Sequence, residues 1–95
     1  MKFYNRGIAA HLTAAIDLLD DDHLIFQNFC GIGPIDLVRI NKNTGEVELY
    51  DVKTDKDNGH RKREQSELQI KLGVKNYYVN LHKRTKRVDG KVEKL

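Results

Sequence analysis

The sequence predicts an α/β domain whose elements follow the order α-β-β-β-α-β. An apolar repeat at helical spacing opens the chain, and four short segments rich in β-forming residues follow it, with a second helical pattern before the last of them. A chain of 95 residues has room for one domain. We expect this domain to span residues 1–81 and a basic tail to span residues 82–95.

The first helix is predicted from an apolar stripe at spacings of three and four residues. The stripe consists of Ile8, Leu12, Ala15, Ile16 and Leu19. Asn5 is a candidate N-cap for this helix. Residues 20–22, all aspartate, predict the exit loop, because acidic side chains are unfavourable at a helix C-terminus.

Three strands are predicted next. The first covers residues 24–29 and ends at residues 30–34, which include two glycines and the only proline. Residues 35–41 and 46–53 are two further strands, joined by a hairpin turn at residues 42–45 that contains Asn and Gly.

A second helix is predicted over residues 61–72, with Gly73 as the residue that ends it. Residues 74–81 form the last predicted strand, in which Tyr77 and Tyr78 point to opposite faces. Both faces of the hairpin are partly apolar, so we expect a mixed sheet flanked by helices.

The composition argues against membrane or secreted classes. The sequence contains no run of the roughly 20 apolar residues that a membrane span requires, and its start lacks the apolar core of a secretory signal. Cys30 is the only cysteine, so it has no partner for an internal disulfide. These features predict an intracellular, cytoplasmic protein.

The charge is divided between the two halves of the chain. Residues 1–58 hold six Lys and Arg against ten Asp and Glu, a net of −4, whereas residues 59–95 hold eleven against four, a net of +7. Basic clusters attract nucleic-acid phosphates, although a solvated charged face remains an alternative. The residues expected to hold phosphates are Arg61, Lys62, Arg63, Lys83, Arg84, Lys86 and Arg87.

The hairpin carries the strongest chemical signal. Symmetric pairing about the turn places Asp36 opposite Asp51, with Lys53 two residues further along the same face. Opposed side chains have Cβ atoms about 4.5–5.5 Å apart, and two carboxylates that close repel each other and raise one pKa. A Mg²⁺ ion would relieve the repulsion, since it prefers oxygen ligands. The alternative is an ordinary hairpin with both aspartates at its solvent edge.

Residues 33–38 (Gly-Pro-Ile-Asp-Leu-Val), followed by a hairpin and residues 51–54 (Asp-Val-Lys-Thr), resemble the signature of PD-(D/E)xK nucleases. The opening of the first helix is similar to small archaeal-type Holliday junction resolvases, and the stretch from residue 36 to residue 81 is similar to stand-alone VRR-NUC domains. The resemblance spans about residues 6–81 and implies a restriction-endonuclease-like core with the same α-β-β-β-α-β order.

By this resemblance, Asp36 and Asp51 are metal ligands for Mg²⁺, with Mn²⁺ as a substitute, and Lys53 orients or activates the attacking water. His11 lies where resolvase-like members have Glu and where RecB-type nucleases have a metal-binding His, so it is a third candidate ligand. Its alternative role is that of a half-buried structural histidine.

Gln65 and Gln69 are four residues apart and would share one face of the second helix. Members of the family often place a Gln of this helix near the active site, so both are candidate catalytic residues. They could equally be two exposed glutamines on a charged helix.

These observations together predict a metal-dependent, structure-selective DNA endonuclease, Holliday junction resolvase-like or specific for flaps and branches, acting as a homodimer. Its size would suit a phage or mobile-element enzyme. A non-catalytic nucleic-acid-binding domain that retains the fold is the main alternative. RNA as the substrate, or a basic tail that docks an acidic protein partner, are two further ones.

Overall fold

The computed structural model describes residues 3–55 and 64–95, and these residues form an α/β fold. The elements are α1 (Phe3–Leu18), β1 (His23–Gln27), β2 (Leu37–Asn41), β3 (Val47–Thr54), α2 (Glu67–Leu72), β4 (Lys75–Asn80), β5 (Thr85–Val88) and β6 (Lys91–Lys94). From α1 to β4 their order is the predicted one.

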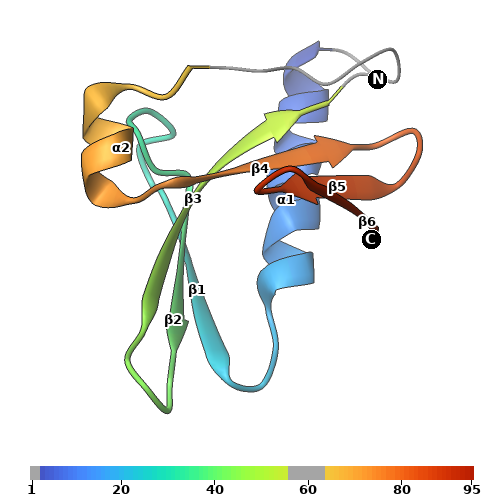
Figure 1. The fold of residues 1–95 in the computed structure, drawn as a ribbon. Helices are drawn as coiled ribbons and strands as arrows, with labels where there is room; N and C mark the ends of the chain where they lie inside the picture. Colours follow the sequence, from blue (N-terminus) through green and yellow to red (C-terminus); the bar gives the residue numbers. More distant parts are fainter. Residues whose placement is uncertain (1–2, 56–63) are drawn as a thin grey trace.

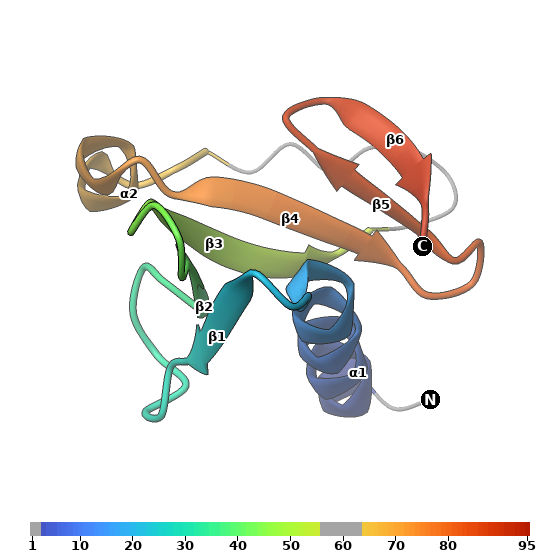
Figure 2. The same cartoon turned by 90° about the horizontal axis from the view of Figure 1, so that it is seen from below.

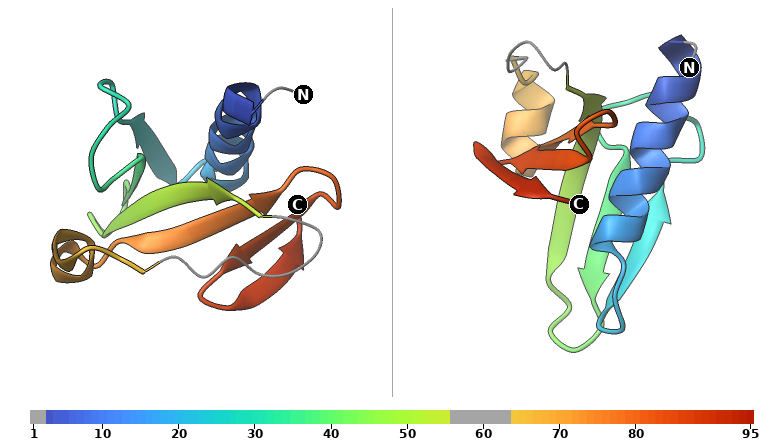
Figure 3. Two further views of the ribbon diagram at one scale, coloured as in Figure 1. Left: turned by 90° about the horizontal axis from the view of Figure 1, so that it is seen from above. Right: turned by 90° about the vertical axis from the view of Figure 1, so that its right-hand side faces the viewer.

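The six strands form one sheet in the order β1-β2-β3-β4-β5-β6. The sheet is mixed, because β3 and β4 are parallel while the other neighbouring pairs are antiparallel. Figures 1 and 3 show the two helices on opposite sides of the sheet, with α1 across β3 and β4 and α2 beside the beginning of β4.

Residues 82–95, expected to be a tail, instead extend the sheet through β5 and β6, which curl away from α1 (Figure 2). The Asn80 side chain starts the turn after β4 by accepting hydrogen bonds from the backbone N–H groups of His82 (3.1 Å) and Lys83 (2.9 Å). Asp89 and Gly90, with positive φ angles of 52° and 79°, then reverse the chain between β5 and β6. Backbone pairing of this kind can form in a segment that has few apolar residues, of which Val88 packs against the core.

The buried face of α1 differs from the predicted one. Ala10, Ala14 and Leu18 face the sheet, whereas most of the predicted stripe faces solvent and Ile16 is 75% exposed. The sheet under α1 carries the large rings of Tyr50 and Tyr77, so small helix residues let the two layers pack closely. The exposed members of the stripe are Ile8, Leu12, Ile16 and Leu19.

The core lies between α1 and the sheet. Tyr50 and Tyr77 pack edge to face, with ring centroids 6.1 Å apart, and the Tyr77 hydroxyl donates a hydrogen bond to the Asp17 carboxylate at 2.5 Å. Tyr78 points to the opposite face, as predicted, and it too is buried. Burial and the Asp17 carboxylate both raise the pKa of Tyr77, so this hydroxyl stays protonated as a donor.

The ends of both helices differ in part from the predictions. α1 begins at Phe3, so Asn5 lies inside the helix and is not its N-cap. α2 begins only after Ser66, whose hydroxyl accepts the first capping hydrogen bond, so Glu64 and Gln65 are not helical. Gly73 ends α2 with a left-handed φ of 70°, as predicted. Residues 61–63 of the predicted helix lie outside the described part of the chain.

The face of the hairpin that points away from α1 is covered less than expected. α2 has six residues and buries none of their side chains, so the apolar residues of β1 on this face remain accessible, with Leu24 43% exposed.

Among the described residues, no helix has the length and apolar character needed to cross a membrane.

The packing predicts unequal costs for two Leu-to-Ala substitutions. Leu37 is fully buried beneath α1, so Leu37→Ala should lower the free energy of unfolding by about 2–5 kcal/mol. Leu24→Ala, on the accessible face, should cost much less because its side chain already contacts water. Urea unfolding of both variants measures the difference, and equal losses would show that the hairpin face opposite α1 is buried in solution.

Candidate active site

The β2–β3 hairpin has the predicted register. Val38 lies opposite Leu49 and Leu37 lies opposite Tyr50. The Asp36 backbone N–H donates to the Tyr50 carbonyl at 2.8 Å, so the pairing continues one residue beyond β2. This brings the carboxyl groups of Asp36 and Asp51 within hydrogen-bonding reach of each other.

The loop from residue 28 to residue 36 delivers Asp36 to this position. The Asn28 side-chain amide donates to the carbonyls of Ile32 and Ile35, both at 2.8 Å, and so ties the loop across its base. Gly33 has a φ of 119°, which L-residues with side chains rarely adopt. The two glycines predicted to break the chain here therefore lie in the turn that leads from β1 into β2.

The Asp36 side chain continues the hydrogen bonding to β3 beyond the first residue of β2. Its Oδ2 accepts a hydrogen bond from the Val52 backbone N–H at 2.7 Å, and the His11 Nε2 of α1 lies 3.6 Å from the same oxygen. The His11 side chain is half-buried. The carboxyl group thus links β2, β3 and α1.

Asp51 is held on the side opposite His11. It is only 6% exposed, the Lys53 ammonium lies 3.3 Å from its Oδ1, and the Gln69 amide donates to its Oδ2 at 3.2 Å. Gln69 also donates to the Pro34 carbonyl at 3.1 Å. The carboxylate is therefore fixed from both β3 and α2.

The structure separates the two candidate glutamines. Gln69 belongs to the capping box of α2, in which its Oε1 accepts from the Ser66 N–H at 3.1 Å, and this orients its amide toward Asp51. Gln65 precedes the helix and donates to the Val74 carbonyl at 2.6 Å, away from the aspartate pair. Five of the six predicted catalytic residues come together: His11, Asp36, Asp51, Lys53 and Gln69.

The pKa of the Asp36 carboxyl is raised above its ordinary value of 3.8, first by burial and then by the hydrogen bond to Asp51. The Val52 N–H and His11 act in the opposite direction on the pKa but do not outweigh these causes. The close approach of two carboxyl groups is therefore favoured when one of them carries a proton or when a cation neutralises the pair.

The donor set suits a hard divalent cation. Mg²⁺ commonly binds through one or two carboxylates and fills its other positions with water and phosphate oxygens, and Asp36 and Asp51 supply two such carboxylates. Within residues 3–55 and 64–95, no three His, Cys, Asp or Glu side chains form a preassembled metal cluster. His11 would thus join as a ligand only if its ring moved.

Four of the seven predicted phosphate-binding residues fall in the described part of the chain. Lys83 and Arg84 are exposed in the turn after β4. Lys86 lies 2.7 Å from the Asp17 carboxylate on the α1 side of the sheet, so its expected role in holding DNA is not favoured. The remaining three residues, Arg61, Lys62 and Arg63, lie outside the described residues.

Arg87 has a structural arrangement of its own. Its Nε donates to the Asp55 carboxylate at 3.1 Å, and its guanidinium carbon lies 3.9 Å from the centroid of the Tyr78 ring. The predicted contact of Arg87 with phosphate stays a prediction.

A pocket of about 310 Å³ opens beside the aspartate pair. It is lined by Gly33, Pro34, Asp51, Lys53, Glu64, Ser66, Gln69 and Asn76. Asn76 was not among the predicted site residues, although it lies directly beside Asp51 in the parallel β3–β4 pairing. Nothing in the sequence marks it, because the register of two parallel strands depends on the long connection between them.

Comparison with protein-family models, with curated proteins and with solved structures found no match for this chain.

The raised pKa of Asp36 predicts how stability depends on pH. A raised folded-state pKa means that stability is complete below the unfolded value near 3.8 and is lost as pH rises through the folded value. Asp36→Asn keeps the neutral form at every pH, so it should raise the free energy of unfolding at neutral pH, and this gain should disappear in acid.

Asp20→Asn is the matched control for this measurement. A hydrogen bond from His23 lowers the pKa of Asp20, so here the stability is present above the ordinary value and is lost as pH falls. This variant should therefore be destabilised at neutral pH and match the wild type in acid. Urea unfolding across pH measures both, and a neutral-pH loss in Asp36→Asn would contradict the account of the aspartate pair.

Proposed function

We propose that this chain is a Mg²⁺-dependent endonuclease that cleaves structured DNA, as a member of the PD-(D/E)xK superfamily. The observation that carries the proposal is the meeting of Asp36, Asp51 and Lys53 at one end of the hairpin. The element order and the mixed sheet agree with the restriction-endonuclease-like core that the resemblance implies.

In this proposal Asp36 and Asp51 hold the metal, and Mn²⁺ can replace Mg²⁺. When bound, the ion would lower the pKa of a water molecule and offset charge on the phosphate. Lys53, partly exposed and 3.3 Å from Asp51, is placed to hold the attacking water or to neutralise the developing phosphate charge. Gln69 orients Asp51 through their hydrogen bond.

His11 has two roles open to it in the same proposal. Its Nε2 is 3.6 Å from Asp36, so a small movement of the ring would let it ligate the metal beside that carboxylate. If it does not move, its electrostatic interaction with Asp36 still acts to lower the pKa of that carboxyl group. An intracellular setting is part of the proposal, because Cys30 is exposed and unpaired and would oxidise outside the cell.

The test is a cleavage panel of four-way junction, flap, nicked duplex and single-stranded DNA with Mg²⁺ or Mn²⁺. Asp51→Asn and Lys53→Met should each reduce cleavage by about 10²-fold or more, because the first removes a carboxylate that would hold the metal and the second removes the positive charge beside the reacting phosphate. DNA binding, measured by fluorescence anisotropy, should persist in both variants.

Asp21→Asn and Lys42→Met are the controls, since both residues are exposed at the opposite end of the hairpin and should leave cleavage unchanged. Wild-type protein that binds DNA but cleaves no substrate would favour the non-catalytic binding domain. Cleavage of RNA but not of DNA would support the proposed metal-dependent phosphodiester hydrolysis and would show that the substrate is RNA.

The proposal includes a homodimer. The exposed stripe of α1, formed by Ile8, Leu12, Ile16 and Leu19, recurs at spacings of four, four and three residues and so lies along one side of the helix. Arg6 lies near one end of this stripe and residues 20–22, three aspartates, at the other. Two copies of α1 packed antiparallel about a two-fold axis would bring opposite charges together and bury both stripes.

Ile16→Glu should therefore convert the dimer to a monomer, because it places a charge at the centre of that interface. Light scattering after gel filtration should give twice 11.0 kDa for the wild type and 11.0 kDa for the variant. Val92→Glu, at an exposed apolar position of β6, should remain dimeric. A monomeric wild type, or a dimeric Ile16→Glu, would contradict this interface.

A further inference from the structure

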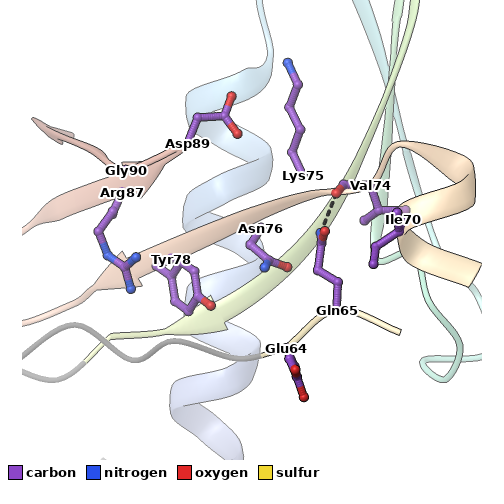
Figure 4. Close-up of a pocket in the computed structure, with 10 residues that line it drawn as sticks. All are labelled: Glu64, Gln65, Ile70, Val74, Lys75, Asn76, Tyr78, Arg87, Asp89 and Gly90. Carbon is purple, nitrogen blue, oxygen red and sulfur yellow. Dashed lines mark hydrogen bonds between the residues drawn. The ribbon is translucent and has the colours of Figure 1, made fainter. Parts of the chain in front are cut away.

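A second pocket, of about 640 Å³, adjoins the candidate active site on the α2 side of the sheet. Val74, which directly precedes β4, and Asn76 and Tyr78 of β4 follow one another along its floor (Figure 4). Glu64 and Asn76 line both pockets, so the two meet at these side chains. A volume of this order is typical of sites for small organic groups.

The walls of this pocket are flat and partly apolar. Ile70 of α2 and Val74, just before β4, supply aliphatic surface on one side. On the other side the Arg87 guanidinium lies over the Tyr78 ring, held there by Asp55. Planar aromatic and guanidinium groups are the surfaces on which proteins stack unpaired bases.

Two side-chain amides in this pocket have hydrogen-bonding capacity to spare. The Asn76 amide makes no hydrogen bond with any residue of the described chain, and Gln65 uses only its Nε2, which donates to the Val74 carbonyl (Figure 4). An amide both donates and accepts, so these groups match the mixed edge of a nucleobase.

The charges of this pocket argue against a phosphate as its ligand. Both of its cations are already paired with carboxylates, Lys75 with Glu48 at 3.4 Å and Arg87 with Asp55 at 3.1 Å. Its other charged residues are the acids Glu64 and Asp89. A neutral ring with polar edges suits these surroundings better than an anion does.

We propose that this pocket binds an unpaired nucleobase of the strand whose phosphate lies at Asp36 and Asp51. The inference rests on the proposed function, and it adds a substrate feature. A base inside a duplex is stacked and cannot enter, whereas a base in a flap, a junction or a single strand can, at little unpairing cost. The pocket would thus select strands with an unpaired base next to the bond that is cut.

An abasic scan tests this inference. Single-stranded 12-mers, each lacking one base, would be bound to the full chain in EDTA, where no metal-dependent cleavage occurs, and their affinity measured by fluorescence anisotropy. Loss of the base at one position should weaken binding about tenfold, within the range for one stacked base. Loss at most other positions should matter little.

Two variants assign this base to the pocket. Asn76→Ala removes the spare amide, and Ile70→Trp fills the pocket from an exposed position of α2. Both variants should bind the intact strand more weakly, and their affinity should no longer depend on which base is missing. Asn5→Ala and Leu68→Trp are the matched controls at exposed positions that line neither pocket, and both should retain the position dependence.

The inference would be overturned if the wild type bound all abasic strands with the same affinity. It would also be overturned if Asn76→Ala and Ile70→Trp kept the wild-type dependence of affinity on the abasic position. Cleavage of the same oligonucleotides in Mg²⁺ is a separate readout. Cleavage together with an affinity that is the same at every abasic position would contradict the base pocket and support the nuclease activity. A position-dependent affinity without any cleavage would support the base pocket and contradict the nuclease activity.

Discussion

The pairing of β2 with β3 is the constraint on which the rest of the site depends. It sets Asp36 against Asp51 at the open end of the hairpin, where the two carboxyl groups repel unless a proton or a cation lies between them. The hydrogen bond from the Val52 N–H keeps Asp36 in this position despite its raised pKa. The fold therefore maintains a local electrostatic conflict that binding of a divalent ion would resolve.

The surrounding elements each fix one member of the site. α1 brings His11 close to Asp36, β3 carries Lys53 on the same face as Asp51, and the cap of α2 directs Gln69 at the buried Asp51 carboxylate. α2 is short and buries none of its side chains, so it leaves part of this face of the sheet uncovered. The two pockets lie on that uncovered surface. The same helix thus orients the Asp51 carboxylate and borders both pockets beside it.

Much of this arrangement could be predicted from sequence because it depends on local patterns. A hairpin turn sets its own register, so the position of Asp36 opposite Asp51 followed from counting residues. The face of α1 could not be predicted in this way, since hydropathy ranks Ile16 above Ala14, while the volume of Tyr50 and Tyr77 beneath the helix decides which one fits. Pairings between distant segments, such as Lys86 with Asp17 or Asn76 beside Asp51, leave no local signal.

The most direct test of the account is an NMR titration of the side-chain carboxyl carbons of Asp36 and Asp51, without and with Mg²⁺. The account predicts that, without the ion, Asp36 titrates with a pKa above the ordinary 3.8, and that saturating Mg²⁺ lowers that pKa and shifts the carboxyl signals of both residues. Titration of Asp36 at its ordinary value, with neither residue changed by Mg²⁺, would contradict it.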